Sequence, residues 1–259
     1  SIALIFEKPS LRTRITFQTG MFQLGGHSVI LDMVLGARES VPDVARNLER
    51  WVDGIVARTF AHAHVVELAR YASVPVVNAL TDLLHPCQIL ADAQALRERK
   101  GGDFGSLKLA FVGDGNNVYH SWACFARRVP LNLTLVCPEG YEPDPAVVAR
   151  AKREAKGEFV ITHDLESGVR GADAIYTDVW ASMGQEEEAG ERERAFAPYQ
   201  VNERVMAMAA PGAVFMHCLP AHRGSEVSDG VMDAPASIVF DQAENRLHAQ
   251  KAIMATLMR

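Results

Sequence analysis

Short apolar and β-branched runs alternate along this sequence with segments whose apolar residues recur at helical spacing. This alternation constrains the fold most, because parallel strands need a long crossover connection, which is usually a helix. The expected strands are 2–6, 28–32, 54–57, 74–77, 107–112, 132–137, 159–162, 174–177, 213–217 and 238–241. We therefore predict an α/β fold with two doubly wound parallel sheets covered by helices.

Glycine and proline mark helix ends and a domain boundary. We expect a helix over 12–24, which ends at a glycine pair, and another over 145–156, which opens with proline. The segment 100–106 holds three glycines after a stretch of helical spacing, which is typical of a linker. At 259 residues the chain is long enough for two domains, predicted as 1–100 and 101–241.

Composition favours a soluble globular protein and argues against several classes. Hydrophobic residues make up 48% of the chain, and no apolar run approaches the roughly 20 residues that cross a bilayer. The apolar start, 1–6, is too short for a signal peptide, which favours a cytoplasmic protein or an organellar one already processed. The four cysteines form no CxxC pair, so neither a disulfide framework nor a zinc site is expected. The net charge of −6 argues against nucleic acid, leaving small molecules or further copies of the chain as partners.

The segment from Glu7 to Arg14 carries donors for an anion between an expected strand and an expected helix. Free N–H groups and the positive end of the dipole attract phosphate to a helix N-terminus, and Ser10 and Thr13 add hydroxyl groups. Arg12 and Arg14 in a first turn oppose the helix dipole, so a bound anion explains them better than solvent does. An ordinary helix cap with two solvated arginines is the alternative.

His85 and Gln88 follow the expected strand 74–77 and open the next helix. Ligands of an open α/β sheet collect beyond the carboxyl ends of its strands, so these side chains are expected at the same crevice as the Ser10 segment. A neutral imidazole and an amide suit an uncharged carbonyl group. Arg58 follows another strand and is placed with them. Helix capping and solvent exposure are the alternative roles.

Three polar segments follow strands of the second half. The turn at 113–117 lacks the G-x-G-x-x-G spacing of a dinucleotide site, so its asparagines are expected to bind an amino-acid-like group. Asp178 at a strand end suits an ammonium, and the polar stretch 185–194 is interpreted as a lid. Cys218 is a candidate nucleophile, metal ligand or polar contact. A metal is the least favoured, because no HExxH or paired CxxC supports it.

Taken in order, FEKPSLRTR, HPCQ, DGNN, DVWASMG and HCLPAHRG resemble the motifs of the ornithine carbamoyltransferases, and the match extends to Arg246. The resemblance implies transfer of the carbamoyl group of carbamoyl phosphate to the δ-amine of L-ornithine, giving L-citrulline and phosphate. It implies a carbamoyl-phosphate domain, an ornithine domain, and a C-terminal helix over 242–259 that returns to the first domain. It further implies a homotrimer or a multiple of trimers. No metal or other cofactor is expected.

The resemblance also assigns residues by their position in these motifs. The implied carbamoyl-phosphate residues are Ser10, Leu11, Arg12, Thr13, Arg14, Arg58, His85, Gln88, Leu219 and Arg246. The implied ornithine residues are Asn117, Asp178, Ser182, Met183 and Cys218. The implied catalytic residues are Arg12, Arg58, His85 and Cys218.

Two departures from the family pattern accompany the match. Leu11 stands where relatives usually have Thr, which removes a hydroxyl but keeps the backbone N–H. The sequence begins at the first expected strand, where relatives usually carry a further helical segment. The alternative functions are a transcarbamoylase for putrescine, N-acetylornithine or aspartate, a nicotinamide-dependent dehydrogenase, and a non-catalytic anion-binding subunit.

Overall fold

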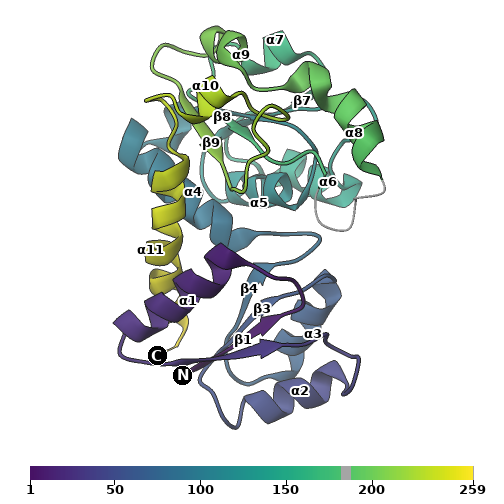
Figure 1. The fold of residues 1–259 in the computed structure, drawn as a ribbon, viewed down its shortest axis with the longest axis vertical. Helices are drawn as coiled ribbons and strands as arrows, with labels where there is room; N and C mark the ends of the chain where they lie inside the picture. The colour runs from purple at the N-terminus through teal and green to yellow at the C-terminus, as the bar shows by residue number, and fades with distance from the viewer. Residues whose placement is uncertain (182–187, 259) are drawn as a thin grey trace. The chain divides into compact units, whose positions relative to one another are not determined.

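A computed structural model describes residues 1–181 and 188–258, which form two compact units (Figure 1). Unit 1 comprises Ser1–Ala91 together with the residues from Glu244 onward, and unit 2 comprises Asp92–Ala243. Helices α4 (Pro86–Lys100) and α11 (Val239–Leu257) contribute residues to both units. None of the helices in the described ranges is long and apolar enough to cross a membrane.

Unit 1 contains a four-stranded parallel sheet in the order β2-β1-β3-β4. The strands are β1 (Ile2–Phe6), β2 (Ser28–Asp32), β3 (Ile55–Arg58) and β4 (Val76–Leu80). The helices wholly within the unit are α1 (Leu11–Gln23), α2 (Val41–Leu48) and α3 (His62–Tyr71). Strand β2 lies on one side of β1, and β3 and β4 lie on the other. The direction in which the chain winds through the sheet therefore changes between β1 and β3.

Strand β1 shows why this sheet is covered on both faces. All five of its residues are buried, and alternate side chains point to opposite faces of a strand. Ala3 and Ile5 pack in a core with residues of α2 and α3, whereas Ile2, Leu4 and Phe6 pack in a second core with residues of α1, α4 and α11. A continuous apolar run therefore forms a central strand with a helical layer on each side, as Figure 1 shows.

Unit 2 contains a five-stranded parallel sheet in the order β7-β6-β5-β8-β9. The strands are β5 (Lys108–Val112), β6 (Asn132–Val136), β7 (Phe159–Thr162), β8 (Ala174–Thr177) and β9 (Val214–His217). The helices among its described residues are η1 (Phe104–Ser106), α5 (Asn117–Ala126), α6 (Pro145–Glu154), α7 (Leu165–Val169), α8 (Ala189–Phe196), η3 (Ala197–Tyr199), α9 (Glu203–Met208) and α10 (Asp229–Met232). Here the winding direction changes between β5 and β8.

The predicted α/β fold with two parallel sheets is confirmed, and one predicted strand is wrong. Residues 238–241 were expected to form a strand, but Val239 begins α11 and the neighbouring Ser237 makes only an isolated bridge to Phe215. A short apolar run fits a buried strand and the first turn of a buried helix equally well, and tertiary packing decides between them. The other expected strands are present with ends shifted by at most three residues.

Candidate active site

In unit 1 the predicted anion-binding residues lie beyond the carboxyl ends of three neighbouring strands. Ser10 follows β1, Arg58 ends β3, and His85 follows β4. Because β1, β3 and β4 are adjacent and parallel, these residues lie at one edge of the sheet. The edge includes the point between β1 and β3 where the winding changes, which is where open α/β sheets bind ligands.

Helix α1 begins with a capped first turn that holds several of the predicted residues. The side chain of Ser10 accepts a hydrogen bond from the N–H of Thr13 at 3.2 Å. This first turn contains no acidic residue, and Arg12 lies within it. The positive end of the helix dipole and a guanidinium group therefore occupy the same region, an arrangement that favours an anion.

Arg246 on α11 connects two of the motifs within unit 1. It is 1% exposed, and its guanidinium donates to Oε1 of Gln88 and, at 3.2 Å, to Oγ1 of Thr13. Gln88 and Thr13 are likewise 1% exposed. A residue near the end of the chain thus fixes the side chains of α1 and α4 that sequence reasoning assigned to carbamoyl phosphate.

His85 is the buried, uncharged group among these residues. Burial, and then the positive charges of Arg246, Arg58 and Arg12, hold the pKa of His85 well below its ordinary value. The imidazole is therefore neutral at pH 7 and suited to a hydrogen bond with a carbonyl group. The same three guanidinium groups make the surroundings strongly positive, which suits a phosphate dianion.

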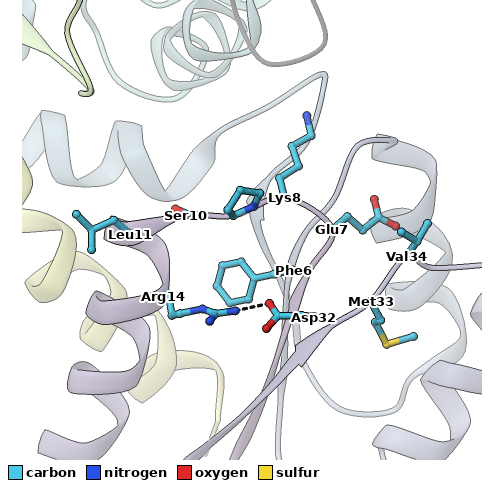
Figure 2. Close-up of a pocket in the computed structure, with 10 residues that line it drawn as sticks. Phe6, Glu7, Lys8, Ser10, Leu11, Arg14, Asp32, Met33 and Val34 are labelled. Atoms are coloured by element: carbon cyan, nitrogen blue, oxygen red, sulfur yellow. Dashed lines mark hydrogen bonds and ion pairs between the residues drawn. The ribbon is translucent and has the colours of Figure 1, made fainter.

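Arg14 and Leu11 differ from the other members of the predicted set. The guanidinium of Arg14 pairs with Asp32 on β2 and lies 5.0 Å from the ring centre of Phe6, as Figure 2 shows. Leu11 is 75% exposed. Both residues line a pocket of about 760 Å³ that also includes Ser10 and Lys8. The structure therefore directs Arg14 toward β2.

Glu7 is an organising residue that sequence reasoning did not assign. Its carboxylate accepts the N–H of Leu35 at 2.8 Å and the N–H of Phe60 at 2.6 Å. It thereby fixes the loops after β2 and β3 beside the end of β1. The neighbouring Lys8 is 8% exposed, with its ammonium 4.2 Å from the ring centre of Phe60. The sequence signal for this role was the presence of two charged residues, Glu7 and Lys8, directly after a buried strand.

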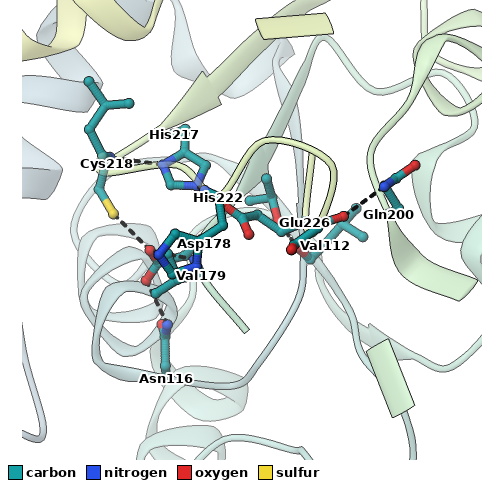
Figure 3. A network of polar contacts seen from close by, with 12 residues as sticks. Val112, Asn116, Asp178, Val179, Gln200, His217, Cys218, His222 and Glu226 are labelled. Atoms are coloured by element: carbon teal, nitrogen blue, oxygen red, sulfur yellow. Dashed lines mark hydrogen bonds and ion pairs between the residues drawn. The ribbon is translucent and has the colours of Figure 1, made fainter. Parts of the chain in front are cut away.

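In unit 2 the predicted ornithine residues also follow neighbouring strands. Asn117 follows β5, Asp178 follows β8 and Cys218 follows β9, and these three strands are adjacent. Asp178 is 7% exposed, and its Oδ1 accepts a hydrogen bond from the thiol of Cys218 at 3.0 Å (Figure 3). A carboxylate and a thiol thus meet at one sheet edge, where a cationic amine can be bound and deprotonated.

Asn116 takes a role that the sequence alone did not reveal. Its Oδ1 accepts the N–H groups of Val118 and Tyr119, and its Nδ2 donates to Oδ2 of Asp178 at 2.8 Å. Asn117, the predicted ligand, is partly buried as the first residue of α5. An asparagine at an N-cap position was a sequence signal for the bonds from the N–H groups of Val118 and Tyr119. It was no signal for the bond to Asp178. Ser182 and Met183, the remaining predicted ligands, lie outside the described residues.

Asp178, His217 and Cys218 place three potential metal-ligating atoms within 4.8 Å of one another. The two nitrogens of His217 are already engaged, since Nδ1 accepts the N–H of Leu219 at 2.8 Å and Nε2 lies 3.2 Å from Glu226. Without His217 the cluster offers two ligands, fewer than a zinc ion requires. The arrangement therefore favours hydrogen bonding.

Arg192 anchors the described end of the stretch interpreted as a lid. Of 185–194, residues 185–187 lie outside the described ranges and the rest leads into α8. Arg192 is 5% exposed, pairs with Asp114 and donates to the carbonyl of Trp180 at 2.6 Å. Burial raises the pKa of Asp114 to about 6, against the lowering effect of Arg192. Sequence reasoning interpreted this stretch as a lid and did not identify Arg192.

Comparison with known proteins gives a consistent result for both units. Residues 1–98 match the carbamoyl-P binding domain, and residues 105–257 the Asp/Orn binding domain, of aspartate/ornithine carbamoyltransferase. The ornithine carbamoyltransferase of Thermococcus kodakarensis is 54% identical over 264 residues, which cover 100% of this chain and 84% of that protein.

Solved structures agree with the sequence comparison. The ornithine carbamoyltransferase of Pyrococcus furiosus superimposes with a TM-score of 0.95 at 50% identity, over 99% of this chain and 84% of that one. A variant of N-acetyl-L-ornithine transcarbamylase has a TM-score of 0.88 at 36% identity, over 99% of this chain and 88% of that one. The chain belongs to the aspartate/ornithine carbamoyltransferase family.

Proposed function

We propose that this chain transfers the carbamoyl group of carbamoyl phosphate to the δ-amine of L-ornithine, forming L-citrulline and phosphate. The observation that carries the proposal is the burial of His85 at the strand ends of unit 1, where burial and the positive charges of Arg246, Arg58 and Arg12 lower the pKa of its imidazole. Cationic donors match the phosphate, and an uncharged imidazole matches the carbonyl oxygen of the carbamoyl group. The identity of 54% to an ornithine carbamoyltransferase supports the same activity.

In the proposed reaction, the lone pair of the neutral δ-amine attacks the carbonyl carbon of carbamoyl phosphate. The tetrahedral intermediate then breaks its bond to the phosphate oxygen, and the electron pair leaves with the phosphate. The amine nitrogen loses one proton as the new C–N bond forms, and an oxygen of the departing phosphate accepts it, so that the phosphate leaves as hydrogen phosphate. Arg12 and Arg58 stabilise charge that gathers on the leaving group, while His85 donates a hydrogen bond to the carbonyl oxygen.

On unit 2 we assign Asp178 and Cys218 to the amine substrate. The Asp178 carboxylate, held by the Cys218 thiol and by Asn116, is 7% exposed. A partly desolvated carboxylate attracts an ammonium strongly, because its charge is less screened than at the surface. Asn117, Ser182 and Met183 complete the proposed amino-acid contacts.

The loop after β5 gives no support to the dehydrogenase alternative. A Cβ atom at Gly115 would lie 2.3 Å from the backbone nitrogen of Pro143, so this glycine permits close packing of two loops. The side chain of Asn116 occupies the N-terminus of α5 by accepting two backbone N–H groups. In a dinucleotide site that position receives the pyrophosphate.

The test supplies carbamoyl phosphate with L-ornithine, putrescine, N-acetylornithine or aspartate and measures phosphate and the carbamoylated product. We expect phosphate release with L-ornithine, accompanied by an equal amount of L-citrulline. Faster turnover with another amine would reassign the substrate. Release with none of the four would leave an anion-binding subunit as the better description.

We also propose that the chain acts in the cytoplasm as a homotrimer or a multiple of trimers. Support for the trimer comes from the family resemblance and from large apolar side chains exposed on unit 1, among them Leu11 at 75%, Phe22 at 77% and Trp51 at 70%. Such residues commonly mark protein interfaces. Light scattering should give a multiple of three times the chain mass of 28.3 kDa, and a monomer would contradict the proposal.

A further inference from the structure

Asp92 on helix α4 is a fully buried carboxylate of unit 2 that has no part in the chemistry proposed above. Its Oδ2 accepts a hydrogen bond from the hydroxyl of Tyr176 at 2.8 Å, and its Oδ1 accepts one from Nε2 of Gln242 at 2.8 Å. All three side chains are 0% exposed. Burying a carboxylate is costly, and apolar side chains of similar volume often pack as well, so the residue calls for a reason beyond stability.

Gln242 connects Asp92 to the end of β9. Its Oε1 accepts the N–H of His217 at 3.0 Å. Because a backbone N–H can only donate, this contact fixes the orientation of the amide and makes its NH2 group the donor to Asp92. His217 is the last residue of β9, and Cys218 follows it. One amide therefore joins Asp92 to the backbone directly before the thiol.

Tyr176 connects the same carboxylate to β8. Its ring stacks on that of Phe111, with ring centres 5.2 Å apart and an angle of 13° between the planes. The stacking holds the ring, and the hydrogen bond to Asp92 holds the hydroxyl. Tyr176 is the residue before the last of β8, so Asp92 is joined to this strand two residues before Asp178.

The two strands that Asp92 joins in this way end side by side. Strands β8 and β9 pair in parallel, and the last pair in their register is Thr177 with His217. The next residue along each strand is Asp178 or Cys218, and the thiol of the second donates to the carboxylate of the first at 3.0 Å. Asp92 thus ties β8 to β9 at the point where their pairing ends and the amine cluster begins.

We propose that Asp92 is a positioning residue for the amine substrate. It holds Tyr176 of β8 and, through Gln242, the backbone of β9, and so fixes the distance between the Asp178 carboxylate and the Cys218 thiol. The inference rests on the proposed function for its catalytic meaning. The spacing of the two groups is separately measurable through the reactivity of the thiol.

An exchange of the carboxylate and the amide tests the contact between Asp92 and Gln242. In Gln242→Glu two carboxylates face each other and the hydrogen bond between them is lost. In the double variant Asp92→Asn/Gln242→Glu the amide again donates to a carboxylate, and the net charge equals that of the parent. We expect Gln242→Glu to lower kcat/KM for ornithine about 100-fold, because small misplacements of reacting groups have effects of this size. The double variant should recover to within about tenfold of the parent.

Tyr176→Phe tests the contact to β8, because it removes the hydroxyl and keeps the stacked ring. We expect kcat/KM for ornithine to fall about tenfold, in line with the loss of one buried hydrogen bond. Tyr199→Phe is the matched control. The hydroxyl of Tyr199 donates to the carbonyl of His163 at 2.8 Å, at a place with no proposed role in the reaction. Its kcat/KM should equal that of the parent.

Two further measurements distinguish a positioning role from a purely structural one. Affinity for inorganic phosphate, which depends on the arginines of unit 1, should be unchanged in every variant. A neighbouring carboxylate disfavours a thiolate, so alkylation of Cys218 by iodoacetamide should accelerate when the thiol moves away from Asp178. Peptide mass spectrometry should show this acceleration in Gln242→Glu and its reversal in the double variant. Cys124, which is also partly buried, serves as the internal control.

The inference is overturned if Gln242→Glu lowers the melting temperature but leaves kcat/KM and the alkylation rate of Cys218 at their parental values. It is also overturned if the double variant is no more active than Gln242→Glu. Should Gln242→Glu fail to fold, the two tyrosine variants decide. Equal kcat/KM in Tyr176→Phe and Tyr199→Phe would then refute the role of Asp92.

These outcomes are distinct from failure of the proposed function. A parent protein that releases no phosphate with any amine would refute the proposed activity. The alkylation rates would still show whether the contacts of Asp92 set the position of the thiol.

Discussion

The polar clusters of unit 1 and unit 2 both lie at the carboxyl ends of parallel strands, but they are stabilised in opposite ways. In unit 1 the positive charges of Arg12, Arg58 and Arg246 converge on a neutral imidazole. In unit 2 the Asp178 carboxylate already accepts hydrogen bonds from Cys218 and Asn116. The first cluster gathers several positive charges, whereas the second is built around a single carboxylate.

The difference indicates what each cluster requires of its ligand. Neighbouring guanidinium groups repel one another, so a bound anion relieves an unfavourable interaction within unit 1. A carboxylate held by a thiol and an amide is oriented in advance, so an arriving ammonium meets a fixed acceptor. We therefore expect substitutions in unit 1 to act mainly on anion affinity and those in unit 2 mainly on the amine.

The largest effect is expected from Arg12→Ala. Charge-assisted hydrogen bonds are worth about 1.5–3 kcal/mol each, and losing two should weaken carbamoyl phosphate binding by about 100-fold to 10,000-fold. Arg14→Ala should have a much smaller effect, because Arg14 is paired with Asp32. Isothermal titration with carbamoyl phosphate measures both.

Arg46→Ala is the control for the loss of an arginine, since Arg46 forms an exposed pair with Asp43 at 3.4 Å. Exposed pairs of this kind contribute at most about 1 kcal/mol to stability. If Arg12→Ala bound carbamoyl phosphate as tightly as the parent does, the anion site would have to be placed elsewhere. An Arg14→Ala defect equal to that of Arg12→Ala would mean that Arg14 leaves Asp32 when the ligand binds.

The second prediction concerns the amine. Asp178→Asn keeps the shape of the side chain and removes its charge, so kcat/KM for ornithine should fall by about 100-fold, roughly 3 kcal/mol. Cys218→Ala should have a smaller effect of the same kind, with Cys124→Ala as its control. Steady-state kinetics with ornithine varied at saturating carbamoyl phosphate are the measurement. If these variants weakened phosphate binding by the same factor as they lowered kcat/KM for ornithine, the two clusters would not have separate roles.

Sequence reasoning located these clusters because parallel topology places strand ends together. Once the segments ending near Ser10, Arg58 and His85 are taken as adjacent strands, their side chains have to share an edge. The pairing of Asp178 with Cys218 follows in the same way from β8 and β9. The sequence predicted the strands and the polar residues that follow them, and the family resemblance assigned Asp178 and Cys218 to the same ligand. The strand order that makes β8 and β9 neighbours comes from the structure.

The contacts that individual side chains make could not be predicted in this way. The direction of Arg14 is determined by Asp32, which lies on another strand, and no local pattern encodes that pairing. The bond from Asn116 to Asp178 and the pair of His217 with Glu226 depend similarly on long-range packing. The run 238–241 failed as a strand because its apolar residues suit either kind of buried element.

The third prediction uses pH to distinguish the clusters. The pKa of His85 is lowered in the folded state, so below pH ~6.5 the unfolded chain binds a proton that the folded chain excludes. The free energy of unfolding should therefore fall as the pH decreases from 7 to 5, by at most about 1.4 kcal/mol per pH unit from this group. Urea titrations of the parent and His85→Gln should show the steeper fall in the parent. Equal slopes would mean that His85 is not buried among cations.

Asp114 in unit 2 should show the opposite sign. Its folded pKa is raised to about 6, so between pH ~4 and 6 the folded chain holds a proton that the unfolded chain has lost. The contribution of this group to stability is present at low pH and is lost as the pH rises through 6. Asp114→Asn should remove that dependence, and a variant that retained it would place the titrating group elsewhere.

The smallest expected effect separates helix capping from ligand binding. Ser10 caps α1 at the proposed anion site, and Asp144 caps α6, which holds no proposed site residue. Replacing either with Ala should lower the free energy of unfolding by about 1 kcal/mol, because each change removes a side-chain acceptor for backbone N–H groups. Only Ser10→Ala should also weaken carbamoyl phosphate binding. Equal ligand affinity in both variants would show that Ser10 acts solely as a cap, and that the anion in unit 1 is held by guanidinium groups without the hydroxyl.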